Sequence, residues 1–278
     1  MTAQTDLSLP NNVIAESKRL QWILRVRPAA LQILLLKLLR RQERRTIFET
    51  KVGVDLYIDP MSGFGNFLVT TGEYERDMCA LISENLPVGG TFVDVGGNEG
   101  FLSCVASKIV GPQGCVLLVE PQRRLHDVIR INLALNDIKN CQIIMKALSD
   151  ETSVVVSLWP STNNGASSIV RPYRWSTDSQ IAPTISFPSL LDECGIGHVE
   201  LVKIDVEGYE KEVVDSMLPA LKSKRVGMVL IEYHESILQS RGMDWRSIEA
   251  QFLSEGMTRL ADPRVFTGDG LAAYRKRT

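Results

Sequence analysis

Short apolar runs alternate with amphipathic stretches along the chain from residue 91 onwards. The apolar runs are rich in β-branched residues and predict strands at 91–95, 115–120, 141–147, 199–206 and 226–233. The amphipathic stretches predict helices at 99–110, 123–136, 209–223 and 244–255. Repeated strand–helix units predict an α/β domain with a doubly wound parallel sheet and helices on both faces. The last apolar segments, 257–262 and 271–277, can close the sheet edge as a hairpin.

The chain before the main domain has a different pattern. Leucines at i, i+3, i+4 and i+7 predict a basic amphipathic helical extension within residues 1–50, after a break at Pro28: Leu31, Leu34, Leu35 and Leu38. This helix either packs on the domain or on a second subunit of a homodimer, or lies on an anionic membrane as a peripheral contact. A membrane span is disfavoured, because charged side chains interrupt the run of about 20 apolar residues that it needs.

Residues 51–278 are predicted to form the main domain. It should open with a short β segment at 52–58, a Gly-rich turn at 60–67 and a helix over 73–86. Between residues 149 and 198 the alternation gives way to a stretch rich in Ser, Thr, Asn and Pro, with two short strands. A long insertion in a compact domain is typical of a functional loop or a disordered segment.

Composition agrees with a globular protein, since 44% of the 278 residues are hydrophobic and 23% are charged. The five cysteines are far apart and form no CxxC pair, which favours reduced thiols over disulfides or a zinc site. The first residues lack the pattern of a secretory signal, so a cytoplasmic location is expected, with a membrane-peripheral position left open by the basic helix.

Charge is unevenly distributed. Residues 18–45 hold nine Lys or Arg and one acid, a local +8, which leaves −10 for the rest of a chain whose net charge is −2. The main domain is therefore not expected to bind nucleic acid.

A glycine-rich turn follows the first strand of the alternating region, in TFVDVGGNEGF at residues 91–101. Such turns bind nucleotides at the carboxyl ends of strands in doubly wound folds. A dinucleotide fingerprint beginning at Gly96 would need glycine at positions 98 and 101, where Asn98 and Phe101 stand. The turn therefore matches a dinucleotide poorly, and an NAD(P)-dependent oxidoreductase remains only an alternative.

A second ligand, S-adenosylmethionine, fits the spacing Asp94, Gly96, Gly100 better. A carboxylate and exposed carbonyls can receive its ammonium group, while turn N–H groups receive its carboxylate. Glu120 ends the next strand, twenty residues beyond Gly100, and can accept hydrogen bonds from ribose hydroxyls. Glu120 therefore indicates a nucleoside, which a dinucleotide and S-adenosylmethionine both contain, and does not distinguish between them.

Acidic residues cluster after the fourth strand of the alternating region, in LVKIDVEGYEKEVV at 201–214. Asp205 ends an apolar strand, where a carboxylate needs a partner. Glu210 and Glu212 are interpreted as acids that favour a helix N-terminus.

Four blocks of the sequence, in this order and spacing, resemble the FkbM family of S-adenosylmethionine-dependent methyltransferases: VDVGGNEG, VEP at 119–121, KALSD at 146–150 and LVKIDVEGYEKEV. The resemblance covers about residues 55–275 and implies a class I methyltransferase fold, which is Rossmann-like and has seven strands, the last antiparallel. It implies methyl transfer, typically to a hydroxyl of a natural product, sugar or glycolipid. Gly97 departs from the alanine common in the family. The cofactor-binding positions it implies are Asp94, Gly96, Gly97, Asn98, Gly100, Glu120, Pro121, Ala147, Leu148 and Asp205.

Methylation of a hydroxyl requires removal of its proton. We predict His234, after the fifth strand of the alternating region, as the general base, with Asp205 or Glu232 orienting it. His126 is expected to be exposed, and His198 to lie in a turn. A divalent metal held by Asp205, Glu207, Glu232 and His234 is an alternative that is not favoured.

Substrate choice is assigned to the insertion at 159–183, which offers aromatic and basic side chains: Trp159, Arg171, Tyr173, Arg174 and Trp175. Tyr74 and Glu75 are expected at the same mouth. The acceptor is predicted to be a small molecule, a glycan or a glycolipid. A non-catalytic, membrane-associated scaffold is a further alternative.

Overall fold

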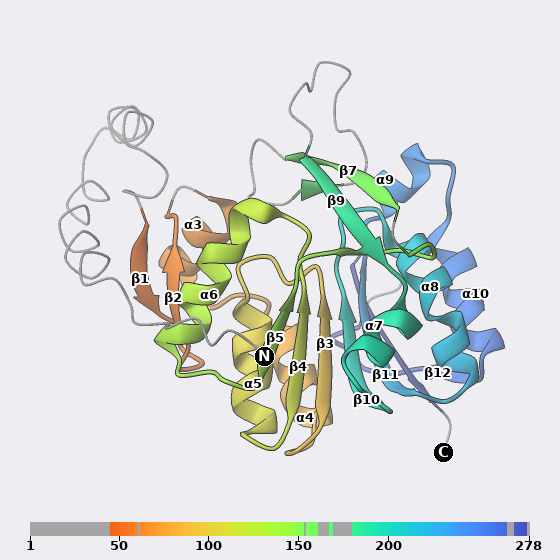
Figure 1. Cartoon of the computed structure of the whole chain (residues 1–278), viewed down its shortest axis with the longest axis horizontal. Helices are drawn as coiled ribbons and strands as arrows, with labels where there is room; N and C mark the ends of the chain where they lie inside the picture. The colour runs from red at the N-terminus through yellow and green to blue at the C-terminus, as the bar shows by residue number, and fades with distance from the viewer. Residues whose placement is uncertain are drawn as a thin grey trace.

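The computed structural model describes residues 45–60, 62–152, 154–160, 167–168, 180–265 and 270–276 (Figure 1). The extension predicted within residues 1–50 lies outside these residues up to position 44. The same holds for the side chains of the 159–183 insertion that were expected to select the acceptor.

A seven-stranded sheet forms the centre of the domain, in the order β12-β13-β11-β10-β3-β4-β5. β13 runs antiparallel to both of its neighbours, and the other paired strands are parallel. This confirms the predicted fold class and the closing hairpin. The strands are β3 (Thr91–Val95), β4 (Cys115–Val119), β5 (Cys141–Ile144), β10 (Val199–Ile204), β11 (Val226–Tyr233), β12 (Met257–Arg259) and β13 (Gly270–Lys276).

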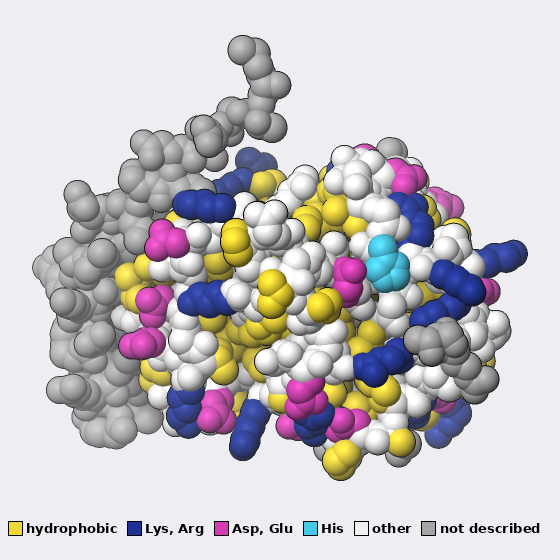
Figure 2. Space-filling view, turned by 90° about the horizontal axis from the view of Figure 1, so that it is seen from below, with side chains coloured by type: hydrophobic (Ala, Val, Ile, Leu, Met, Phe, Trp, Pro, Cys, Tyr) yellow, Lys and Arg dark blue, Asp and Glu magenta, His cyan; other side chains and the backbone are white. Residues whose placement is uncertain are grey.

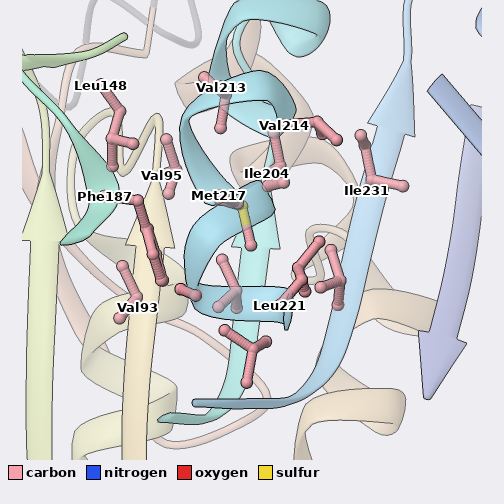
Figure 3. Packing of buried hydrophobic residues seen from close by; sticks show 14 of the residues in the cluster. Val93, Val95, Leu148, Phe187, Ile204, Val213, Val214, Met217, Leu221 and Ile231 are labelled. Atoms are coloured by element: carbon pink, nitrogen blue, oxygen red, sulfur yellow. The ribbon is translucent and has the colours of Figure 1, made fainter. Parts of the chain in front are cut away.

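Helices cover both faces of the sheet, because successive strand residues point to opposite sides and both sides are apolar. Val93 and Val95 pack into the cluster under one helical layer, whereas Phe92 packs into the other. Figure 3 shows α8 lying over the sheet, with Met217 and Leu221 between helix and strands. The first layer contains α7 (Phe187–Glu193), α8 (Glu210–Lys222) and α10 (Trp245–Ser254), and the second α4 (Arg76–Asn85), α5 (Phe101–Val110) and α6 (His126–Leu135).

The prediction of a Gly-rich turn at 60–67 is wrong, because α3 (Gly63–Thr71) begins within these residues. The Ser62 side chain caps this helix by accepting a hydrogen bond from the Gly65 N–H at 2.9 Å. A Cβ on Gly65 would lie 2.1 Å from the Asp59 carbonyl oxygen. Glycine is therefore needed at position 65 because the helix lies close to the Asp59 backbone, and not because the chain turns there.

Three other boundaries differ from the predictions. Residues 46–49, assigned to the N-terminal helix, form β1 (Thr46–Glu49), which pairs with β2 (Asp55–Ile58). The stretch at 149–198, for which no helix was predicted, contains α7. Ser186 caps this helix, and Pro188 lies in its first turn. The strand predicted at 141–147 divides into β5 and β6 (Ala147–Leu148). Short elements not predicted are the 3-10 turn η2 (Arg123–Leu125) and α9 (Glu235–Ser240).

A smaller sheet with the order β6-β9-β7-β8 lies beyond the carboxyl ends of β3 and β4, at the top of Figure 1. It contains the two strands expected in the insertion, β7 (Val155–Pro160) and β9 (Gln180–Ile185), together with β8 (Ser167–Ser168). In the part of the chain that the structure describes, no helix has the length and apolarity needed to cross a bilayer.

Candidate active site

The turn after β3 approaches β10 so closely that it requires glycine. Gly96 has φ +79°, and a Cβ there would lie 1.8 Å from the carbonyl oxygen of Asp205. The N–H groups of Gly96 and Gly97 both donate to the Val119 carbonyl, at 3.0 and 3.2 Å. The turn is therefore held between the two strands that flank β3.

A cavity of about 340 Å³ opens beside this turn, at the carboxyl ends of β3, β4 and β10. It brings together most of the predicted cofactor-binding positions: Gly96, Asn98, Glu120, Pro121, Ala147, Leu148 and Asp205. The sequence did not predict the aromatic side chains that α3 adds, Phe64 and Phe67. Tyr74, expected at the mouth, also lines the cavity.

Glu120 is 2% exposed, yet it lines the cavity. Its Oε2 accepts a hydrogen bond from the Asn98 N–H at 2.9 Å, and its Oε1 accepts one from the Gln122 N–H at 2.8 Å. Burial raises the pKa of Glu120 to about 7, although these hydrogen bonds act in the opposite direction. The two amides fix the carboxylate at the edge of the cavity.

His126 was expected to be exposed, which is wrong. The residue is buried at the start of α6, and its Nε2 lies 2.8 Å from the carbonyl oxygen of Glu120. Burial lowers the pKa of His126. Its contact supports the backbone that carries Glu120.

Asp94 lies beneath the turn rather than in the main cavity, and is fully buried. Its Oδ2 accepts a hydrogen bond from Ser103 Oγ at 2.7 Å, and its Oδ1 lies 3.3 Å from Lys203 Nζ. Lys203 also donates to the Gly96 carbonyl at 2.9 Å. Asp94 and Lys203 therefore hold the turn against β10.

No role for Lys203 was predicted from the sequence, although a lysine within an apolar central strand is a signal that a buried counter-charge lies nearby. The residue is 2% exposed. Burial alone would lower the pKa of Lys203, but the charges of Asp94 and Asp205 outweigh that effect and raise it.

His234 lies directly after β11, beside the acids that follow β10. Its Nδ1 lies 2.7 Å from Glu210 Oε1, and its Nε2 lies 3.7 Å from Asp205 Oδ1 and from Glu207 Oε2. Burial alone would lower the pKa of His234, but the hydrogen bond with Glu210 and the neighbouring carboxylates raise it to about 10. The raised pKa favours the protonated form of His234 in the free protein.

Glu210 contacts Nδ1 of His234, a contact not predicted from the sequence, where Glu210 was interpreted only as an acid in the first turn of a helix. Glu210 is fully buried, and its Oε1 also accepts a hydrogen bond from the Gly208 N–H at 2.9 Å. Glu232 lies among other carboxylates, since one side-chain oxygen from each of Glu75, Asp205 and Glu232 lies within 4.8 Å of the other two.

Carboxylates predominate around His234, at a corner formed by Glu75, Asp205, Glu207 and Glu232; this corner adjoins the main cavity through Asp205 and Glu207. Burial raises the pKa of Glu75 to about 8 and also raises the pKa values of Glu207 and Glu232. Atoms of Asp205, Glu207 and His234 also lie within 4.8 Å of one another. The corner therefore favours a positively charged ligand group.

On the face seen in Figure 2, which lies at the amino ends of β3 and β4, acidic and basic side chains are interspersed. The described part of this face has no continuous basic surface of the kind that binds nucleic acid.

Comparisons with solved structures give low similarity. A precorrin-6y C5,15-methyltransferase from Geobacter metallireducens is 13% identical, with a TM-score of 0.44, and the match covers 74% of this chain and 90% of that chain. A SAM-dependent methyltransferase from Aquifex aeolicus is 14% identical, with a TM-score of 0.42, covering 72% of this chain and 87% of that chain.

Sequence comparisons are more specific. A curated relative, the hexuronic acid methyltransferase AglP of Haloferax volcanii, is 28% identical over 166 residues, which cover 59% of this chain and 64% of AglP, less than two thirds of its length. Residues 94–257 match the methyltransferase FkbM domain, a segment that starts at Asp94 and includes Glu120, Asp205 and His234. The chain therefore belongs to the FkbM family of methyltransferases.

Proposed function

We propose that this protein is an S-adenosylmethionine-dependent methyltransferase that binds its donor in the cavity beside the Gly96 turn. The proposal rests on the position of Glu120 and Asp205, which follow the two strands on either side of β3 and line one cavity. Glu120 would accept the ribose hydroxyls, and the apolar Ala147 and Leu148 would contact the adenine. The amino-acid end of the donor would lie at the turn and Asp205.

The acceptor is proposed to be a hydroxyl group on a sugar, a glycolipid or a related natural product. Support comes from the name of the relative AglP, a hexuronic acid methyltransferase. The cavity mouth, with Phe67 half exposed, offers an apolar surface of the kind that packs against a sugar ring.

A bound donor supplies an electrophilic methyl group on a sulfonium centre. The protein must then align the acceptor hydroxyl and remove its proton. We assign the removal to Nε2 of His234, whose ring Glu210 orients through Nδ1. The pKa of His234 falls when a positive charge is placed beside Asp205 and Glu207, because these carboxylates then stabilise the imidazolium less. His234 thus becomes a competent base only in the donor-loaded protein.

The donor assignment predicts that Glu120→Gln weakens binding of S-adenosylhomocysteine by about 10- to 100-fold, since a hydrogen bond to a charged group contributes about 1.5–3 kcal/mol. Isothermal titration calorimetry measures the affinity. Glu151→Gln, at an exposed position, is the matched control and should bind normally. If the wild-type protein binds NADH but not S-adenosylhomocysteine, the NAD(P)-dependent oxidoreductase is supported instead.

We expect methyl transfer to survive dialysis against EDTA. Lys203 and His234 already compensate the carboxylates in part, and the donor brings a further positive charge. The measurement is the rate of S-adenosylhomocysteine release before and after dialysis, with Mg²⁺ restored as a control. A loss of activity that Mg²⁺ reverses would instead support a metal at Asp205, Glu207 and His234.

A further inference from the structure

We infer that Glu75, together with Asp205 and Glu232, binds the primary ammonium group at the amino-acid end of the methyl donor. The inference rests on the proposed function, because it names the residues that hold one end of the proposed ligand. It differs from the sequence-based expectation, in which Asp94 received this group. Asp94 already has a counter-charge, because Lys203 Nζ lies 3.3 Å from its Oδ1, and its Oδ2 accepts a hydrogen bond from Ser103; Asp94 Oδ1 itself has no hydrogen-bond partner among the described residues.

The backbone of Glu75 is held in an unusual conformation at the start of α4. Its φ is +44°, a left-handed value that a residue other than glycine seldom adopts and that clusters at functional sites. Its carbonyl accepts the Cys79 N–H at 2.9 Å, and the ring of Tyr74 packs edge-on against Phe64 with centroids 4.7 Å apart. The Glu75 side chain shares a cavity lining with Gly96 and Asn98 of the turn after β3.

One carboxylate oxygen of Glu75 lacks a partner. Its Oε2 is buried and accepts no hydrogen bond within the described part of the chain. A buried carboxylate oxygen without a donor is strongly unfavourable. A donor group on a ligand would satisfy this oxygen, for which the described residues supply none.

Glu75 lines a small cavity of about 30 Å³, whose lining also includes Asp94, Gly96, Asn98, Lys203 and Asp205. Gly96, Asn98 and Asp205 line the main cavity too, so the two cavities adjoin at the turn. The volume admits one small polar group.

The chemistry of the corner fits an ammonium group. Oxygens of Glu75, Asp205 and Glu232 lie within 4.8 Å of one another, and an ammonium has three N–H donors for three such acceptors. Lys203 Nζ donates to the Gly96 carbonyl and lies 3.3 Å from Asp94 Oδ1 and 3.5 Å from Asp205 Oδ2, so it compensates Asp205 only in part. The raised pKa of Glu75, about 8, agrees with a desolvated carboxylate that ionises fully only beside a cation.

The test compares two ligands that differ in the amino-acid end. S-adenosylhomocysteine carries the ammonium group, whereas 5′-methylthioadenosine lacks it and keeps the nucleoside. By calorimetry, Glu75→Gln should weaken S-adenosylhomocysteine binding at least about tenfold, equivalent to 1.4 kcal/mol, and leave 5′-methylthioadenosine binding unchanged. Glu73→Gln, two residues away and paired with Lys51 outside the cavities that hold Glu75, should change neither affinity.

Retained binding of 5′-methylthioadenosine shows that the Glu75→Gln protein is folded, and Glu75→Asp should give an intermediate loss. Equal losses for both ligands, or no loss for S-adenosylhomocysteine, overturn the inference while the proposed function stands. A Mn²⁺ titration in which Glu75→Gln loses metal binding but keeps S-adenosylhomocysteine affinity assigns the corner to a metal instead. If the wild-type protein binds neither nucleoside, the proposed function fails and the inference with it.

Discussion

Replacement of His234 by glutamine is expected to lower kcat by about 10²- to 10⁴-fold, the usual contribution of a positioned general base. Glutamine cannot take up the proton that the acceptor hydroxyl must lose. The affinity for S-adenosylhomocysteine should change little, because His234 is not among the residues that line the donor cavity. Steady-state kinetics with a sugar acceptor and calorimetry with S-adenosylhomocysteine measure the two quantities separately.

The pH profile gives an independent reading of the same residue. The pKa of His234 is raised in the free protein, so kcat/KM for the donor, which reports the free protein, should rise as pH increases towards 9. Glu210→Gln removes the hydrogen bond that raises the pKa of His234, and should shift this rise to lower pH. His198→Gln, at an exposed position, should change neither kcat nor the profile. Full activity in His234→Gln would assign proton removal to another group.

Gly96→Ala is expected to lower the free energy of unfolding by about 4 kcal/mol or more, the range reached only by severe steric or polar defects. The added methyl group would lie 1.8 Å from a backbone oxygen of Asp205, and backbone cannot move aside as a flexible side chain does. Donor binding should be lost together with the turn. Urea denaturation and calorimetry with S-adenosylhomocysteine check both effects.

Gly89→Ala is the matched control for this substitution. Gly89 has φ +78°, almost the same as the +79° of Gly96, but its Cβ would meet no described atom within 4 Å. The Gly89→Ala substitution should lower the free energy of unfolding by only about 1–2 kcal/mol, the cost of the left-handed conformation alone. Similar losses in both variants would mean that φ, and not the contact with β10, explains the glycine at position 96.

The sequence alone predicted the alternating core of the fold. Each central strand is a short apolar run, and each helix beside it is amphipathic, so local periodicity was enough to place strands such as β3 and β11. α3 was missed because two glycines outweighed the weaker helical pattern of Phe64 and Leu68. The function of Gly65 depends on Asp59, which only the folded chain places beside it.

The sequence also determined the chemistry of the turn, since residue types at fixed spacing matched a methyl donor and the FkbM family. What only the tertiary structure decided is which charged groups meet. Glu75, the 205–210 segment with Asp205 and Glu210, and His234 come from three separate parts of the chain, and their contacts have no signature in local periodicity. Burial raises the pKa of Glu75, whereas the hydrogen bond with Glu210 and the nearby carboxylates raise the pKa of His234 against the effect of burial, because desolvation and short-range charge depend on three-dimensional position.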